Sequence, residues 1–234
     1  GLVVITCQPQ NTDFFVNRLK NFNIPTVFVE RRPDNIDVSF AGFDNHKTVF
    51  TITSALLDKG YREIALFTGN SNFSSEKDCI NGYLNAFQSH GISLEHPMIY
   101  ETNMSKESAF KAAMANLCSH QVQAVITTSD NIASGILEMF HIFGVRIPND
   151  VQLITLSEES WNTSTKYPGI ILTSRTAYTL GREAAKLLEE NIKSPVLFEE
   201  KTLTFSDSVP NLDRLLTEPP KFRPFIHTPP RDRG

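Results

Sequence analysis

Side chains capable of acid–base, nucleophilic or metal chemistry are scattered along this chain and form no recognisable catalytic constellation. The histidines are His46, His90, His96, His120, His141 and His227, and none has a partner at metal-ligand spacing. The adjacent carboxylates of Glu158 and Glu159, and of Glu189 and Glu190, fit solvated ends of helices or loops better than an acid–base pair. The sequence contains neither a Gly-x-Ser-x-Gly elbow nor a Walker-type glycine loop. We therefore expect a protein that is not an enzyme and that uses no cofactor.

Polar and sulfur-containing side chains recur instead where predicted strands end. In open α/β sheets, small ligands bind beyond the carboxyl ends of the strands. The positions of this kind are Ile5 to Cys7, Glu30, Asn70 to Ser75, Met104, Thr128 to Asp130, and Ser157. The pattern predicts a binding cleft, provided that the surrounding elements bring these positions together.

The segment from Thr127 to Leu156 gives the clearest indication of those elements. A run of β-formers precedes it, and apolar residues then recur at helical spacing: Ile132, Ala133, Ile136, Leu137, Phe140 and Phe143. Asp130 stands where an N-cap belongs, and Gly144 stands where a glycine ends a helix. A second short run of β-formers, Val151 to Leu156, follows Pro148. A strand, a helix and a strand within about thirty residues form a βαβ unit, whose strands are parallel.

The same alternation runs through the rest of the chain. Further strands are predicted near 2–6, 24–30, 38–43, 61–68, 98–100, 167–173 and 201–205, and further helices near 11–22, 44–58, 74–90, 105–118 and 180–188. Residues 2–6 show no polar alternation, so we expect that strand to be buried on both faces. The alternation predicts an α/β fold with parallel sheets and right-handed crossovers.

Composition narrows the class of protein. The chain has 234 residues, 40% hydrophobic and 21% charged, which is ordinary for a soluble globular protein. A net charge of −4 gives no overall basic footprint for nucleic acid. No apolar run reaches the roughly 18 residues of a membrane helix, and the first ten residues lack the basic start of a signal peptide. The three widely spaced cysteines, Cys7, Cys79 and Cys118, argue against a disulfide framework and favour a reducing compartment.

Several of these segments together resemble the lactose-repressor/galactose-repressor (LacI/GalR) family of bacterial transcription regulators. That family has an Asp-x-x-Ala-x-Gly helix, then Gly-x-x-x-Pro-x-Asp and a strand. The matching residues here are Asp130, Ala133, Gly135, Gly144, Pro148 and Asp150. The segments 24–31, 60–69 and 180–188 and the pair Gly82 and Tyr83 also match, so the resemblance covers about residues 1–216.

The resemblance implies two Rossmann-like lobes of the periplasmic-binding-protein-like type I fold, with helices on both faces of parallel sheets. The first lobe is expected at 1–43 and 174–202, and the second at 44–173 and 203–216. The first lobe is expected to be incomplete, because two leading βα units, a hinge helix and a helix-turn-helix headpiece of the family have no match here. It should therefore expose a sheet edge. Residues 217–234 are rich in proline and match no family segment, which is typical of an extended or disordered arm, with a partner-binding segment as the alternative.

The resemblance also implies which residues line an effector cleft. Cys79 stands where the family usually has an effector-gripping arginine, and Ser157 where it usually has an aspartate. Met104 replaces a common aromatic residue, Ser129 replaces a common asparagine, and Asp130 is retained, with a purely structural capping role as the alternative. The effector-binding positions are thus predicted to be Ile5, Glu30, Phe73, Ser75, Cys79, Met104, Ser129, Asp130 and Ser157, and no metal ligand is predicted.

These replacements weaken the contacts that a sugar needs. They favour a less polar effector, a protein partner or no effector, unless neighbours such as Glu30, Asn70, Asn72, Ser74 or Ser75 replace the lost contacts.

The function implied by the resemblance is the ligand-binding and dimerisation core of a bacterial transcriptional regulator. An effector- or partner-dependent lobe rearrangement would control operator DNA binding. The expected partners are a second copy of the chain, a small-molecule effector and operator DNA reached only through the headpiece, with no membrane and a cytoplasmic location. The alternative is a periplasmic solute-binding protein of similar fold, which the odd number of cysteines and the segment around Pro148 disfavour.

Overall fold

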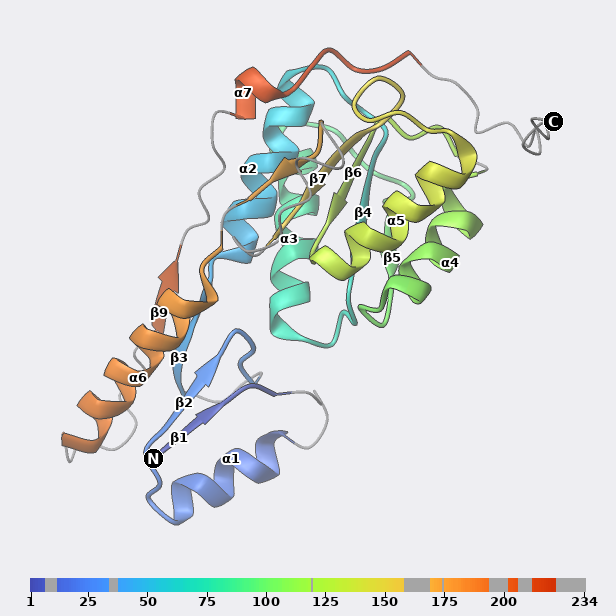
Figure 1. Ribbon diagram of the computed structural model, residues 1–234. Coiled ribbons are helices and arrows are strands. Elements are labelled where there is room, and N and C mark those ends of the chain that lie inside the picture. Colours follow the sequence, from blue (N-terminus) through green and yellow to red (C-terminus); the bar gives the residue numbers. More distant parts are fainter. Residues whose placement is uncertain are drawn as a thin grey trace.

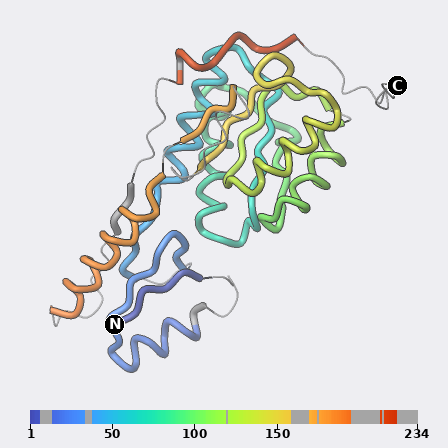
Figure 2. The backbone as a smooth tube through the Cα atoms, in the orientation of Figure 1, coloured from blue at the N-terminus to red at the C-terminus, as the bar shows by residue number. Residues whose placement is uncertain are grey.

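The fold consists of two α/β lobes placed end to end, each built on a parallel sheet, as the ribbon and the backbone tube show (Figures 1 and 2). The computed structural model describes residues 1–6, 12–33, 38–118, 120–157, 169–173, 175–193, 202–205 and 212–221. The predicted α/β class with parallel sheets is confirmed. None of the helices in these ranges is long and apolar enough to cross a membrane.

The second lobe is built on a parallel sheet with the strand order β5-β4-β6-β7-β8 (Figure 1). Its strands are β4 (Ile64–Thr68), β5 (Ile99–Glu101), β6 (Ala124–Thr127), β7 (Gln152–Thr155) and β8 (Ile171–Leu172). Its helices are α2 (Asn45–Asp58), α3 (Ser74–Ser89), α4 (Lys106–Leu117) and α5 (Asp130–Phe143). Side chains alternate across a strand, so Ile64 and Leu66 pack with α2 and α3, whereas Ala65 and Phe67 pack with α4 and α5. Both faces of this sheet are therefore covered.

The first lobe is built on a sheet with the strand order β1-β2-β3-β9, all parallel. The strands are β1 (Leu2–Val4), β2 (Thr26–Val29), β3 (Ser39–Phe43) and β9 (Thr202–Phe205). Helix α1 (Thr12–Asn21) packs through Val16 near Phe28, and α6 (Ala177–Lys193) packs through Leu180 and Leu187 on the opposite face. The predicted lobe boundary between 202 and 203 cuts through β9, and the whole of this strand pairs with β3 in the first sheet.

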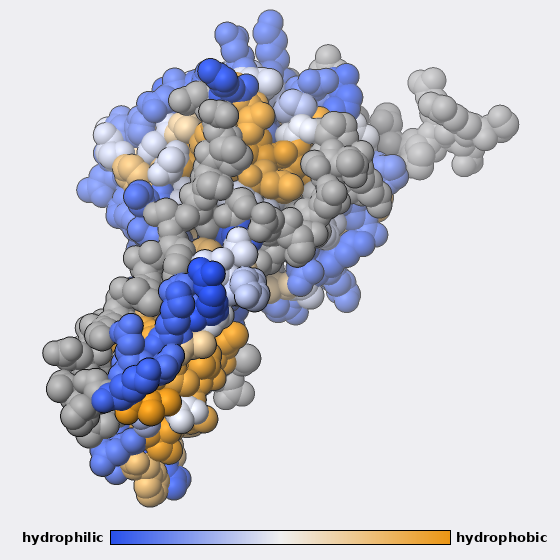
Figure 3. Space-filling model, turned by 60° about the vertical axis from the view of Figure 1, so that its left-hand side comes forward, coloured by the Kyte–Doolittle hydropathy of each residue, from blue (hydrophilic) through white to orange (hydrophobic). Residues whose placement is uncertain are grey.

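The prediction that residues 2–6 form a strand buried on both faces is wrong. The strand is shorter, and its Leu2 and Val3 are 40% and 51% exposed. In the described part of the chain β1 is the edge strand of its sheet, so no further strand pairs with its outer side. Figure 3 shows hydrophobic surface on this lobe. Phe14 and Phe22, which also lie in the first lobe, are large hydrophobic side chains exposed to solvent.

Two glycines set how closely the helices of the second lobe approach one another. A Cβ atom on Gly82 of α3 would lie 2.4 Å from the carbonyl oxygen of His46 in α2. A Cβ atom on Gly135 of α5 would lie 2.2 Å from the carbonyl oxygen of Lys106 in α4. Both distances are far below van der Waals contact, so only glycine permits this packing.

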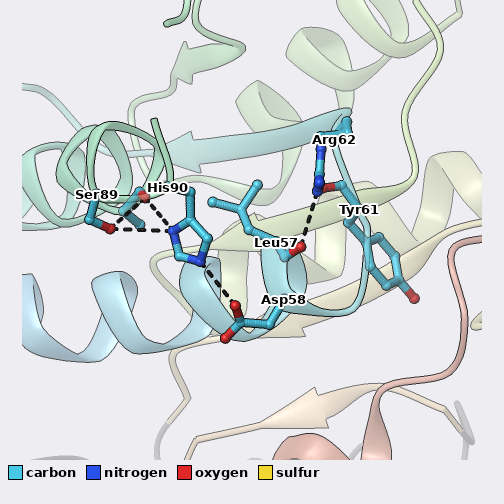
Figure 4. A network of polar contacts seen from close by, with 7 residues as sticks. Leu57, Asp58, Tyr61, Arg62, Ser89 and His90 are labelled. Atoms are coloured by element: carbon cyan, nitrogen blue, oxygen red, sulfur yellow. Dashed lines mark hydrogen bonds and ion pairs between the residues drawn. The ribbon is translucent and has the colours of Figure 1, made fainter. Parts of the chain in front are cut away.

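A polar network joins the C-terminal ends of α2 and α3 (Figure 4). His90 Nε2 lies 3.1 Å from Asp58 Oδ1, and His90 Nδ1 lies 2.8 Å from the carbonyl oxygen of Ala86. The hydrogen bond to the Ala86 carbonyl, and then the Asp58 carboxylate, raise the pKa of His90 above its usual value. Arg62 Nη1 donates to the carbonyl oxygen of Leu57 at 3.0 Å in the same region.

The chain after β9 returns to the second lobe. Leu212 of the short helix α7 (Leu212–Leu215) and Leu216 enter its core. The hydroxyl of Tyr61 donates to the carbonyl oxygen of Thr217 at 3.2 Å. The start of the predicted tail is thus in contact with the second lobe, and residues 222–234 lie outside the described residues.

Candidate functional site

A pocket of about 90 Å³ lies between the two lobes. It is lined by Glu30, Asn45, Ser75, Glu76, Cys79, Met104, Thr128, Ser129, Asp130, Leu156 and Arg175. Six predicted positions are therefore neighbours in space, namely Glu30, Ser75, Cys79, Met104, Ser129 and Asp130. They come together because the carboxyl ends of parallel strands meet at one edge of each sheet.

Two of the lining residues have a left-handed backbone. Glu30, directly after β2, and Met104, just before α4, each have φ of 63°. Non-glycine residues in this conformation cost on the order of 1–3 kcal/mol and cluster at ligand clamps and switch regions. The strain turns the chain after each strand, and both side chains line the pocket.

Glu76 is a pocket residue that sequence reasoning missed. Its side chain is buried, and Oε2 accepts hydrogen bonds from Thr68 Oγ1 at 2.7 Å, the Gly69 amide at 2.9 Å and Thr128 Oγ1 at 2.8 Å. The first turn of α3 also favours a carboxylate, because its amides carry a partial positive charge. The only sequence signal was its place directly after the predicted cleft segment Asn70 to Ser75, in the first turn of a predicted helix.

Arg175 is another pocket residue that was missed, as are Asn45 and Leu156. It lies in the crossover between β8 and α6 and is only 6% exposed. Its Nη2 donates to Asn45 Oδ1 at 2.6 Å, and its guanidinium carbon lies 4.8 Å from the centre of the Phe43 ring. The rule that ligands bind beyond strand ends could have placed Arg175 near the cleft, because it follows β8 closely, but its pairing with Asn45 has no signal in the sequence.

The remaining predicted residues occupy other places. Ser157 is buried, and its Oγ donates to the carbonyl oxygen of Thr173 at 2.8 Å, so it joins two strand ends and does not line the pocket. Ile5 is 56% exposed and lines neither this pocket nor its neighbour. Asp130 was predicted as the N-cap of α5, but Ser129 is the cap: its backbone is extended and its Oγ accepts from the Ile132 amide at 3.4 Å.

A larger pocket of about 690 Å³ adjoins the first one through Met104. Its lining residues are Arg31, Asn70, Phe73, Glu101, Thr102, Asn103, Met104 and Ser108. Phe73 therefore belongs to this second pocket, beside Arg31 of the first lobe. In the described ranges no group of three or more histidine, cysteine, aspartate or glutamate side chains could hold a metal ion. The arrangement fits the binding of a small molecule.

Comparison with known proteins identifies relatives along most of the chain. The family model for periplasmic binding proteins and the sugar binding domain of the LacI family matches residues 1–209. A probable HTH-type transcriptional regulator, EndR of Paenibacillus polymyxa, is 26% identical over 195 residues, which are 82% of this chain and 56% of that protein. The ribose operon repressor of Haemophilus influenzae is 28% identical over 169 residues, which are 70% of this chain and 51% of that protein. The chain thus spans about half the length of these curated relatives.

Solved structures share the fold. The transcription regulator CcpA of Lactococcus lactis superposes with a TM-score of 0.76 at 24% identity, over 88% of this chain and 74% of that one. A LacI family transcriptional regulator from Enterococcus faecium with bound ribose superposes with a TM-score of 0.75 at 19% identity, over 89% of this chain and 77% of that one. At these identities the likeness is one of fold, so any ligand has to be argued from the residues of this chain.

Proposed function

Because the chain belongs to the family of periplasmic binding proteins and LacI-family sugar-binding domains, we propose that it is the effector-binding core of a LacI-type transcriptional regulator. The observation that carries the proposal is the polar pocket between the lobes, to which both lobes contribute residues. A ligand held there contacts both lobes, so it stabilises one lobe arrangement over another in proportion to its difference in affinity. In a dimer, such a shift changes the spacing of two DNA-binding headpieces at their half-sites.

A regulator is favoured over a periplasmic solute-binding protein by the relatives. EndR, RegA of Clostridium saccharobutylicum and the ribose operon repressor are named as transcriptional regulators or repressors. None of these names denotes an enzyme, which supports a binding function. A regulator of this kind acts in the cytoplasm, so we propose a cytoplasmic location. The chain has a net charge of −4, so we propose that DNA contact belongs to a headpiece outside these residues.

The active unit is proposed to be a homodimer, because a helix-turn-helix reader needs two half-sites related by two-fold symmetry. Sedimentation of the intact protein at micromolar concentration tests this proposal. A dimer supports it, and a protein that remains monomeric contradicts it.

Selection of genomic DNA fragments by the intact protein tests the regulator proposal. The intact protein should enrich a short sequence with two-fold symmetry, and the isolated 1–234 chain should enrich nothing. Failure of the intact protein to enrich any sequence, or salt-sensitive submicromolar DNA binding by the 1–234 chain alone, would contradict it.

A further inference from the structure

We propose that Arg31 is a built-in ligand of the cleft: its guanidinium fills a cation-binding site between the lobes and holds them closed until a cationic effector replaces it. The inference rests on the proposed function, because it assigns the cleft as the effector site. It adds the chemical class of the effector and a mechanism for the unliganded state.

Three electron-rich groups surround the Arg31 guanidinium. Its central carbon lies 4.0 Å from the ring centre of Phe73 in the second lobe. Nη2 donates to the Met104 sulfur at 3.4 Å, and Nη1 donates to the carbonyl oxygen of Thr6 at 3.3 Å. An aromatic face, a thioether and a carbonyl oxygen all attract a cation. Their convergence therefore defines a site selective for a positively charged, planar group.

The same contacts join the two lobes. Arg31 and Thr6 belong to the first lobe, whereas Phe73 and Met104 belong to the second. The neighbouring Arg32 adds two links to α3: its amide donates to Ser74 Oγ at 2.8 Å, and its Nη2 lies 3.6 Å from Asp78 Oδ2. The left-handed backbone of Glu30 directs this short segment toward the second lobe. Residues 31 and 32 thus form a clasp between the lobes.

The clasp borders the larger pocket. Met104 lines both pockets, and Arg31 lines the larger one. A molecule that binds against the Phe73 ring in the larger pocket has to displace the guanidinium from it. Carboxylates are present in both pockets, with Glu30 and Glu76 in the smaller one and Glu101 in the larger one. The effector class that fits is therefore a small cation with a guanidinium or amidinium head.

Chemical rescue of the intact Arg31→Ala protein tests the proposal, because the substitution removes the equivalent of an ethylguanidinium group. Hydrogen exchange is followed at the Arg32 amide, whose bond to Ser74 Oγ joins the first lobe to the second. We expect exchange there to become roughly 5-fold faster, equivalent to about 1 kcal/mol of lost cation–π attraction. Millimolar ethylguanidinium should restore slow exchange, and the neutral isostere ethylurea should not.

Arg18→Ala is the matched control, because Arg18 rests on the Phe14 ring at 5.6 Å within the first lobe alone. It should leave exchange at Arg32 unchanged. Wild-type exchange in Arg31→Ala, or equal rescue by ethylguanidinium and ethylurea, would overturn the proposal. If Arg31→Ala does not fold by circular dichroism, Phe73→Leu replaces it: faster Arg32 exchange supports the clasp, and unchanged exchange contradicts it. The readout uses neither DNA nor effector, so its failure is distinguishable from a failure of the regulator proposal.

Discussion

The carboxylate of Glu76 accepts a hydrogen bond from the hydroxyl of Thr128 at 2.8 Å, across 52 positions of sequence. The same oxygen also accepts from Thr68 and Gly69 at the end of β4. One buried carboxylate therefore ties the first turn of α3 to the ends of two neighbouring strands. It fixes one wall of the pocket before any ligand arrives, so pocket shape and lobe stability depend on the same atom.

The first prediction concerns this carboxylate. Glu76→Ala leaves an amide and two hydroxyls without their acceptor and should lower the free energy of unfolding by about 2–4 kcal/mol. Glu76→Gln keeps one acceptor oxygen for the same donors, so it should cost less than half as much. Urea denaturation measures both. Glu107→Ala, which removes an exposed pair with Lys111, is the control and should leave the stability essentially unchanged, because solvent screens that pair. Equal costs for Glu76→Ala and Glu76→Gln would contradict the role of the oxygen.

A second prediction compares two helical glycines. In Gly135→Ala the new methyl group meets the backbone of Lys106, so the variant should lose about 1–3 kcal/mol of stability. Gly181 lies within α6, and a Cβ atom there meets nothing within 4 Å. Gly181→Ala should therefore gain about 0.5–1 kcal/mol from helix propensity. Thermal or chemical denaturation measures the change in stability of each variant. A loss of stability in both variants would show that the packing argument is wrong.

The third prediction is a pH dependence at His90. Its pKa is raised in the folded protein by the Ala86 carbonyl and Asp58. A histidine whose pKa is raised by folding stabilises the fold fully at pH values below its pKa in the unfolded state. This contribution is lost as pH rises through the pKa of the folded state. The difference in unfolding free energy between wild type and His90→Gln should therefore be larger near about pH 5 than near about pH 8.5. The same difference at both pH values would argue against a contribution from the charged ring.

A fourth prediction concerns sugars. Cys79 is buried where the family usually has an arginine, and the Ser157 hydroxyl is bonded to Thr173. Loss of both charged partners should weaken the binding of a free sugar by on the order of 2–5 kcal/mol, about two to four decades of affinity. In calorimetry of the intact protein, no mono- or disaccharide should bind at low micromolar concentration. Cys79→Arg should improve sugar binding, because Cys79 lines the pocket. Ser157→Asp should not improve it, because that side chain lies outside the pocket and the carboxylate would face the Thr173 carbonyl oxygen.

The sugar prediction has a clear counter-result. If one sugar binds at low micromolar concentration or tighter, then other residues have replaced the lost partners and the prediction fails. Glu76 and Arg175 are the polar pocket residues available for such a replacement.

Local signals made the second lobe predictable. The helix from Asp130 to Phe143 and its end at Gly144, whose φ is 66°, follow from apolar spacing and one glycine. The identity of the N-cap did not follow, because Ser129 and Asp130 are both capping residues and only the extended backbone at Ser129 decides between them. The close approach of α4 and α5 at Gly135 did not follow from local signals, since it depends on a carbonyl group in another helix.

The parts that were missed depend on contacts between distant residues. Arg175 reaches Asn45 across 130 positions, and nothing near Arg175 in sequence indicates that pairing. The burial of β1 was predicted from its own apolar run, although burial depends on which strands lie beside it. The sheet membership of β9 was missed for the same reason, because pairing with β3 is a long-range property.

The central claim is that the state of the interlobe pocket is coupled to DNA binding. Its most direct test is the DNA affinity of the intact protein, on the sequence that it selects, for wild type and for Arg175→Ala. Arg175 links the pocket to Asn45 and Phe43 and lies outside any DNA-binding headpiece. We predict that the variant shifts DNA affinity by about 5- to 150-fold, the usual range of allosteric coupling, while the control Glu107→Ala leaves it unchanged. A folded Arg175→Ala protein that binds DNA with wild-type affinity would contradict the account.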